Sequence, residues 1–200
     1  MKKISIIIIS LLFLNCSDKE EALSFYRKGI EFYSKKSLEK AIIEFESAIK
    51  ADKKFVSARL MKGKSEYYLG KHPEAKITFE SINEDFPGNA AALTWLGKIA
   101  MLDSSKRNDA KQYLSLAVQL DDNQIDSHYY LGKLFEQEGN VKDALIQYNQ
   151  AIEISRRVDK VKRDLAEIYR NAGVSMPNES VSSITKTDNK ESQKQKNKQK

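Results

Sequence analysis

The stretch Leu93-Thr94-Trp95-Leu96-Gly97-Lys98-Ile99-Ala100 places a glycine in the middle of an apolar segment that we expect to be helical. Glycine inside a helix costs about 1 kcal/mol relative to alanine, so its presence there needs a packing reason. The same glycine recurs at intervals of 34, 34 and 35 residues, as Gly29, Gly63, Gly97 and Gly132. Self-similarity at this period is typical of a helical repeat array.

Three further ladders of residues keep the same period. They are Ala41, Ala75, Ala110 and Ala144; Phe45, Phe79, Leu114 and Tyr148; and Ala48, Ile82, Ala117 and Ala151. Residues four positions apart share one face of a helix, so each unit is predicted to have a second helix that packs on the first. We expect the glycine to let the two helices approach closely, with the large residue filling the space beside them.

At these positions the chain resembles the tetratricopeptide repeat family. Its pattern has an aromatic residue, Leu-Gly, a second aromatic three residues later, Ala-x-x-x-Phe and a closing proline. The fourth unit matches with Leu131, Gly132, Phe135, Ala144 and Tyr148. The resemblance covers about residues 22–158 and implies an all-α solenoid.

Some positions depart from the family pattern. Lys28 and Lys62 replace the usual leucine before the glycine, and Glu66 stands where an aromatic residue is usual. The third unit has one extra residue in the turn at 103–108. These departures loosen the match without breaking the four-unit register.

The predicted domain organisation follows from these ladders. The four helix-turn-helix units cover 22–55, 56–89, 90–124 and 125–158, and a capping helix at 159–172 completes the array. The cap is expected because the last unit of a repeat array would otherwise expose an apolar face, and Val161, Leu165, Ile168 and Tyr169 fall at helical spacing.

The N-terminal residues 1–15 are predicted to be a signal peptide, because two lysines precede an apolar run at 4–14. That run would rise only about 16 Å as a helix, short of the roughly 30 Å hydrocarbon core. Cys16, the sole cysteine, follows directly, and the junction resembles a bacterial lipoprotein signal whose cysteine becomes the lipidated first residue. Asn15 departs from the usual Gly, Ala or Ser, as in the relaxed signals of spirochaetes. Residues 16–21 would then form a lipidated tether. The alternatives are an ordinary signal peptide or an uncleaved anchor.

The C-terminal residues 173–200 are rich in Lys, Ser and Gln and almost free of apolar side chains, so we expect them to be disordered. The ends supply most of the formal net charge of +6, which leaves the repeat body nearly neutral. This balance gives no reason to expect a nucleic-acid partner. The tail could contact anionic lipid headgroups or wall polymers, or have no function.

The sequence offers little for catalysis. His72 and His128 are the only histidines, and no metal-ligand spacing joins them to a thiol or a carboxylate cluster. His72 is expected in a surface turn, and His128 stands at a position that this family fills with a packed aromatic residue. We therefore expect no enzyme activity, no metal and no cofactor beyond a covalent lipid on Cys16.

The resemblance implies a peptide-binding groove on the concave face, lined by the first helix of each unit. The expected groove residues are Tyr26, Ile30 and Tyr33; Leu60, Lys64, Tyr67 and Tyr68; Thr94, Lys98 and Met101; and Tyr129, Lys133 and Glu136. Lys64, Lys98 and Lys133 each follow the glycine directly, so they would form a cationic row. With the tyrosines beside them, they favour an acidic, partly apolar segment of another protein. The competing interpretation is that these lysines are ordinary surface residues and the tyrosines pack between helices.

One variant of the family is disfavoured. Members that grip the C-terminal carboxylates of chaperones use Lys, Asn and Arg over three repeats. The matching positions here are Tyr26, Ile30, Met61, Ala91 and Trp95, which lack a charged grip.

Together these features predict an exported, lipid-anchored scaffold for protein–protein interaction in a bacterial cell envelope, as part of an assembly or secretion complex. The alternative is a surface-displayed lipoprotein that binds host molecules. A third hypothesis, an enzyme accessory or wall-binding protein, draws only on the basic tail.

Overall fold

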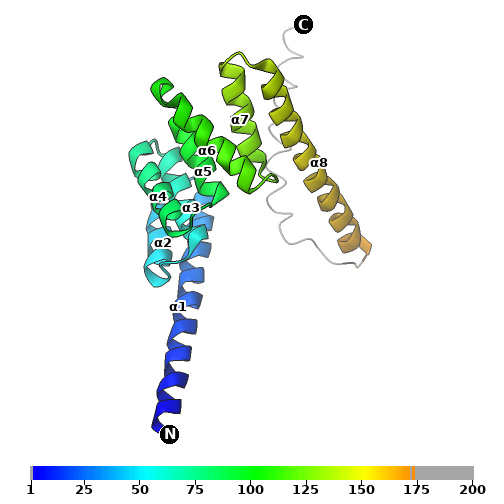
Figure 1. Ribbon diagram of the computed structural model, residues 1–200. Coiled ribbons are helices and arrows are strands. Elements are labelled where there is room, and N and C mark those ends of the chain that lie inside the picture. The colour runs from blue at the N-terminus through cyan, green and yellow to red at the C-terminus, as the bar shows by residue number, and fades with distance from the viewer. Residues whose placement is uncertain (1, 172, 174–200) are drawn as a thin grey trace, which may run out of the picture. The chain divides into compact units, whose positions relative to one another are not determined.

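The computed structural model describes the backbone of residues 2–171 and 173, and within this range the side chains from residue 18 onward (Figure 1). Its described part contains α-helices and one short 3-10 helix, and no strand. The helices are α1 (Lys2–Ser34), α2 (Leu38–Ala51), α3 (Val56–Tyr68), α4 (His72–Asp85), α5 (Ala90–Ala100), η1 (Ser104–Lys106), α6 (Arg107–Leu120), α7 (Ile125–Gln137) and α8 (Val141–Asn171). The predicted all-α repeat solenoid is confirmed.

Successive helices form the expected pairs. Most loops between them have three or four residues, which makes neighbouring helices antiparallel. From α1 to α7 each α-helix packs on the next one, and the first helices of adjacent units also touch: α1 with α3, α3 with α5, and α5 with α7. A stack in which each unit contacts its neighbours is the expected result of the 34-residue period.

The mid-helix glycines face the large residues of the second helices. A Cβ atom added to Gly29 would lie 2.5 Å from the Phe45 ring, and one added to Gly97 would lie 2.6 Å from Leu114 Cγ. At Gly132 the nearest atoms of Tyr148 would be 2.9 Å away. The packing reason predicted for these glycines is therefore confirmed.

The core lies between consecutive units and is built from the ladder residues. One cluster joins α4 and α5 through Ala75, Phe79, Ile82, Trp95 and Leu96. A second cluster joins α5, α6 and α7 through Ala100, Ala110, Leu114, Leu131 and Leu134. Burial of these apolar side chains provides the main stabilisation of the array.

Glycine and proline mark the turn of the second unit. Gly70 has φ +78° and lies just beyond the end of α3, where the N–H of Lys71 donates to the carbonyl of Glu66 at 2.9 Å. A glycine in this conformation commonly ends a helix, because residues with a Cβ avoid it. Pro73 lies in the first turn of α4, where its missing N–H leaves no intrahelical bond unmade.

Glu66, which replaces an aromatic residue of the family pattern, is only 5% exposed. Its carboxylate accepts a hydrogen bond from the Thr78 hydroxyl at 2.7 Å and pairs with the Lys62 ammonium at 2.8 Å. Lys62 is the residue that replaces the usual leucine, so the two departures from the pattern compensate each other. A buried carboxylate needs such partners to remain inside.

The chain divides into two compact units, Met1–Ile152 and Glu153–Lys200, and the second begins inside α8. The capping segment predicted at 159–172 is not a separate helix, because α8 continues without a break to Asn171. No helix-breaking residue separates the fourth repeat from this segment, so the backbone hydrogen bonds simply continue. Whether the segment caps the array stays a prediction.

The predicted terminal segments are described only in part. Residues 2–15 of the predicted signal peptide and Cys16 fall within α1, but Met1 and the side chains of residues 2–17 lie outside the described residues. Of the predicted tail, residues 174–200 lie outside them as well. Among the helices that the structure describes, none is both long and apolar enough to cross a membrane.

Candidate functional site: the first-helix surface

The centre of the predicted groove is an aromatic cluster around Lys98. The Lys98 Nζ atom lies 4.3 Å from the ring centroid of Trp95, 4.6 Å from that of Tyr67, 4.9 Å from that of Tyr130 and 5.2 Å from that of Tyr68. These rings come from α3, α5 and α7, so one ammonium group connects three consecutive units. Cations are attracted to the faces of aromatic rings within about 6 Å, and most strongly to tryptophan.

The same rings pack on one another. Trp95 stacks on Phe79 with their centroids 5.6 Å apart, and it meets Tyr67 and Tyr68 edge-on. Burial raises the pKa of Tyr67 above its usual value. Tyr68 is 54% exposed and lies at the open side of the cluster, where its ring centroid is 6.4 Å from that of Tyr33 in the first unit. The cluster thus joins a rigid apolar base to an accessible tyrosine.

The three lysines of the predicted row differ in their surroundings. Lys98 is held by the ring faces, and Lys64 lies 5.5 Å from the Trp95 ring while remaining partly exposed. Lys133 is exposed on α7. Among the described residues, none of the three forms an ion pair with a carboxylate. The predicted groove surface therefore carries positive charge that is not neutralised by ion pairs with nearby carboxylates. Lys98 differs from the other two lysines, because aromatic rings surround its ammonium group.

The groove assignment of Thr94 is wrong. Thr94 is only 3% exposed, and its hydroxyl lies 2.7 Å from the Ser127 hydroxyl and donates to the carbonyl of Ala90 at 2.8 Å. Its side chain joins α5 to α7 instead of facing the surface. The small hydroxyl side chain lets α5 and α7 approach each other. The position of Thr94 within its repeat does not by itself predict this contact.

Several other predicted groove residues are partly exposed and also pack against neighbouring helices. Leu60 packs against the core cluster of α4 and α5, and the Tyr26 ring packs on Phe45 and Phe55. Ile30 and Tyr33 are half-buried. At these positions the side chains are partly buried because they pack between helices, as the competing interpretation expects for the tyrosines.

The fourth unit has a more open surface. Tyr129 is 44% exposed and contacts the rings of Tyr130 and Tyr148. Glu136 accepts a hydrogen bond from the Tyr148 hydroxyl at 2.7 Å, so its carboxylate is partly engaged within the protein. This unit therefore presents aromatic and charged groups side by side.

Two ring contributors were absent from the predicted groove, Trp95 and Tyr130. Trp95 precedes Lys98 by three positions, which puts both on one side of α5, and this spacing was a usable signal. Tyr130 comes from the next unit and reaches Lys98 only through the packing of α7 on α5.

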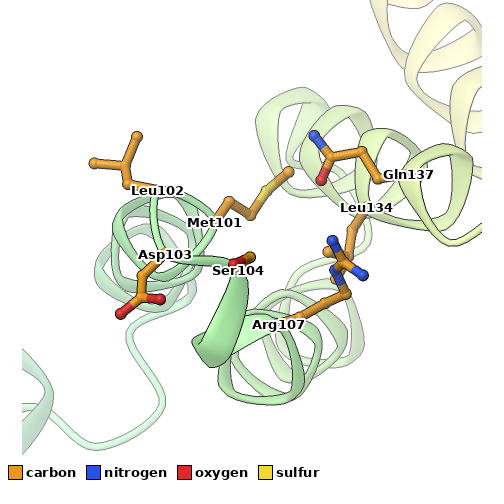
Figure 2. A pocket seen from close by; sticks show the side chains of 7 residues that line it. All are labelled: Met101, Leu102, Asp103, Ser104, Arg107, Leu134 and Gln137. Atoms are coloured by element: carbon orange, nitrogen blue, oxygen red, sulfur yellow. The ribbon is translucent and has the colours of Figure 1, made fainter.

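Met101 lines a pocket at the end of α5 (Figure 2). Its cavity volume is about 280 Å³, and residues of the turn after α5, of η1, of α6 and of α7 border it. Figure 2 shows Met101, Arg107, Leu134 and Gln137 directed toward the same space. The pocket thus extends the predicted groove surface beyond the first helices.

The histidines have structural surroundings. His128 is buried, with Nδ1 2.7 Å from Gln147 Oε1 and Nε2 3.0 Å from the carbonyl oxygen of Asp122. The predicted packing role of His128 is confirmed. The half-buried His72 lies against the Tyr67 ring at the start of α4.

The repeat pattern matches a known family. Residues 60–125 and 125–157 both match descriptions of the tetratricopeptide repeat. The chain belongs to the tetratricopeptide repeat family. This confirms the resemblance drawn from the glycine and alanine ladders. No curated protein matches the sequence.

Solved structures of tetratricopeptide proteins share the fold. MamA of Desulfovibrio magneticus RS-1, from residue 41 to its end, is 22% identical, with a TM-score of 0.56 over 70% of this chain and 78% of that one. The thermophilic protein TTC0263 of Thermus thermophilus is 18% identical, with a TM-score of 0.61 over 76% and 83%. The first repeat domain of Spaghetti (RPAP3), bound to the HSP90 peptide SRMEEVD, is 16% identical, with a TM-score of 0.55 over 60% and 95%.

Tetratricopeptide repeats are modules for protein–protein interaction, and proteins of this fold generally act as scaffolds and not as enzymes. The repeats of this chain support the same role, a scaffold with protein partners.

Proposed function

We propose that the chain is a lipid-anchored tetratricopeptide scaffold in a bacterial cell envelope, where it holds an acidic, partly apolar segment of another protein. The observation that carries the binding role is the cluster around Lys98, where rings of three units surround one ammonium group. Aromatic residues that combine a broad apolar face with a polar tip are enriched at protein interfaces.

Two features support a ligand of negative charge. Lys64 and Lys133 have no carboxylate partner within the described residues, and both are accessible to solvent. The exposed Tyr68 and Tyr129 supply apolar surface beside them. Complementary charge sets the orientation and the specificity of such a contact more than its affinity.

The solved complex of Spaghetti with an HSP90 peptide shows that a related fold can hold an acidic peptide. The residues of this chain favour a different binding specificity. At the positions of the chaperone clamp it has Tyr26, Ile30, Met61, Ala91 and Trp95, and Trp95 is packed on Phe79. We therefore propose an internal acidic segment as ligand and not a chaperone C-terminus.

The test is a crosslinked pull-down from native membranes. Wild type is compared with Lys64→Glu/Lys133→Glu, and with Lys98→Glu as a separate variant, because that change also disturbs the aromatic cluster. The matched control reverses two exposed lysines of second helices, Lys50→Glu/Lys142→Glu. We expect a defined set of envelope proteins to disappear from the Lys64→Glu/Lys133→Glu variant, called the groove variant below, and from Lys98→Glu, and to be retained by the control variant. Equal recovery from all variants would refute the groove function.

The proposed anchor rests on Cys16 and its position after an apolar run. Metabolic labelling with an alkyne fatty acid should mark wild type and leave Cys16→Ser unlabelled. Equal labelling of both proteins would exclude this anchor. Protease treatment of intact cells then separates the two envelope roles, because a surface-displayed lipoprotein that binds host molecules would be digested and an internal scaffold would be protected.

A further inference from the structure

The pocket beside Met101 owes its shape to the one unit that is longer than the others. The extra residue of the third unit lies in the turn that forms η1 (Ser104–Lys106), directly before α6. In the second unit this connection consists of the short turn through Gly70. The longer turn leaves a cavity of about 280 Å³ between the ends of α5 and α7.

The side chains that face the cavity combine one cation with apolar walls. Figure 2 shows the Arg107 guanidinium and the Gln137 amide directed toward the same space, with Met101 and Leu134 beside them. Leu134 is buried and belongs to the core cluster of α5, α6 and α7, so the wall that it forms is fixed. Leu102 points away from this space in the same view.

Asp103, which lines the pocket, and Glu138, which follows the lining residue Gln137, already have partners. Asp103 points away from the cavity, accepts hydrogen bonds from the backbone N–H and the hydroxyl of Ser105, and lies 3.7 Å from the Lys106 ammonium. Glu138, next to Gln137, is paired with Lys111 at 2.9 Å. Within the described residues Arg107 itself forms no ion pair.

The backbone adds to the positive character of the site. Arg107 is the first residue of α6, a helix of 14 residues, so the N-terminal end of that helix borders the pocket. The partial positive charge of a helix N-terminus favours an anion there. A guanidinium group also presents paired N–H donors whose geometry matches a carboxylate.

We propose that this pocket anchors one acidic side chain of a partner protein, with the carboxylate on Arg107 and an apolar neighbour of that residue against Met101 and Leu134. The inference rests on the proposed function, since it assigns a specific anchor to the partner segment of the groove. Met101 belongs to both surfaces, so a segment that leaves the groove at the end of α5 enters the pocket.

The test uses the full chain and defined dipeptide probes. The acidic probe is N-acetyl-leucyl-glutamyl amide, whose only charge is the side-chain carboxylate, and the neutral probe replaces glutamate with glutamine. Binding is followed by the NMR signal of the Met101 methyl group, one of four methionines in the chain, which a Met101→Leu spectrum assigns. N-acetyl-leucine serves as a probe with a chain-end carboxylate.

We expect the acidic probe to shift the Met101 signal saturably and the neutral probe to bind about fivefold more weakly or worse. Arg107→Gln should weaken the acidic probe to the same extent. Lys142→Gln, which removes one positive charge at an exposed lysine that does not line the pocket, should change the dissociation constant less than about twofold. Arg107→Lys should recover only part of the affinity, because an ammonium lacks the paired donors.

Three results would overturn the proposal: no saturable shift with the acidic probe, equal binding of both dipeptides, or wild-type affinity in Arg107→Gln. Tighter binding of N-acetyl-leucine than of the acidic dipeptide would assign the pocket to a chain end and likewise overturn it. The pull-down separates this proposal from the groove function. If Arg107→Gln keeps every partner that the groove variant loses, the pocket fails and the groove stands. If the probe binds at Arg107 but the groove variant keeps its partners, the groove fails and the pocket stands.

Discussion

Gly63 and Phe79 are placed so that no side chain fits at residue 63. A Cβ atom there would lie 2.7 Å from Cζ of the Phe79 ring, well inside the distance at which two carbon atoms repel. Phe79 is fully buried and stacks on Trp95, so its ring cannot easily move aside. This contact sets the distance between α3 and α4, and through Trp95 it supports the aromatic cluster around Lys98.

We predict that Gly63→Ala destabilises the protein by about 1–3 kcal/mol, although alanine is the better helix former by about 1 kcal/mol. The overpacked ring costs more than the gain in helix propensity. Urea unfolding followed by circular dichroism measures the difference. Ser57→Ala on the exposed side of the same helix is the control, and it should stay within about 0.5 kcal/mol of wild type. A more stable Gly63→Ala would show that the packing argument is wrong.

Lys98→Met should lower the free energy of unfolding by about 0.5–2 kcal/mol, because it removes an ammonium group from four ring faces while leaving an unbranched side chain that is only one atom shorter. It should also shift the fluorescence of Trp95, the only tryptophan. Lys133→Met makes the same exchange at an exposed site and should change neither quantity appreciably. If both variants behave alike, the rings contribute nothing to holding Lys98.

Lys62 and Glu66 can be exchanged together for the residues that the repeat family usually has. We predict that Lys62→Leu/Glu66→Tyr is neutral or stabilising by about 1–4 kcal/mol, because two partly desolvated charges give way to apolar packing. Lys62→Leu alone should destabilise by about 3–5 kcal/mol, since it removes the ammonium partner of a nearly buried carboxylate. Thermal or urea unfolding of the two variants tests the pair, and a double variant less stable than the single one would contradict this account.

The Tyr148 hydroxyl makes a pH-dependent contribution. Burial, together with the hydrogen bond to Glu136, raises the pKa of Tyr148 from 10.0 to about 12. The folded state therefore favours the neutral phenol. Its stabilising contribution is complete below pH 10 and is lost as the pH rises from 10 toward 12.

The comparison with Tyr148→Phe isolates this effect. The difference in urea midpoint between wild type and Tyr148→Phe should be constant from about pH 8 to about pH 9.5 and should shrink above about pH 10. Glu136→Gln removes the nearby negative charge and so lowers the raised pKa of Tyr148, and in that variant the loss, which still begins near pH 10, should be smaller and should end at a lower pH. A difference that is independent of pH up to about pH 11 would contradict the raised pKa.

Much of the architecture could be predicted from the sequence because repetition multiplies a weak signal. One glycine inside a helix is ambiguous, but four glycines in phase with the Ala41 and Phe45 ladders require the same helix pair each time. The same argument placed the packing of His128. It failed at Thr94, because a residue in phase with groove positions can face the neighbouring helix when its side chain is small and finds a hydroxyl partner.

The sequence alone determined the fold class, the number of units and the pairing of each glycine with a large residue of the second helix. These depend on spacing along the chain, which helical geometry converts directly into faces. The tertiary structure decided what the surface can bind. The ring of Tyr130 reaches Lys98 only because α7 packs on α5, and the Arg107 pocket forms only because η1 lengthens one turn. Both depend on distances between separate repeat units, and these distances cannot be predicted from the spacing of the repeat along the sequence.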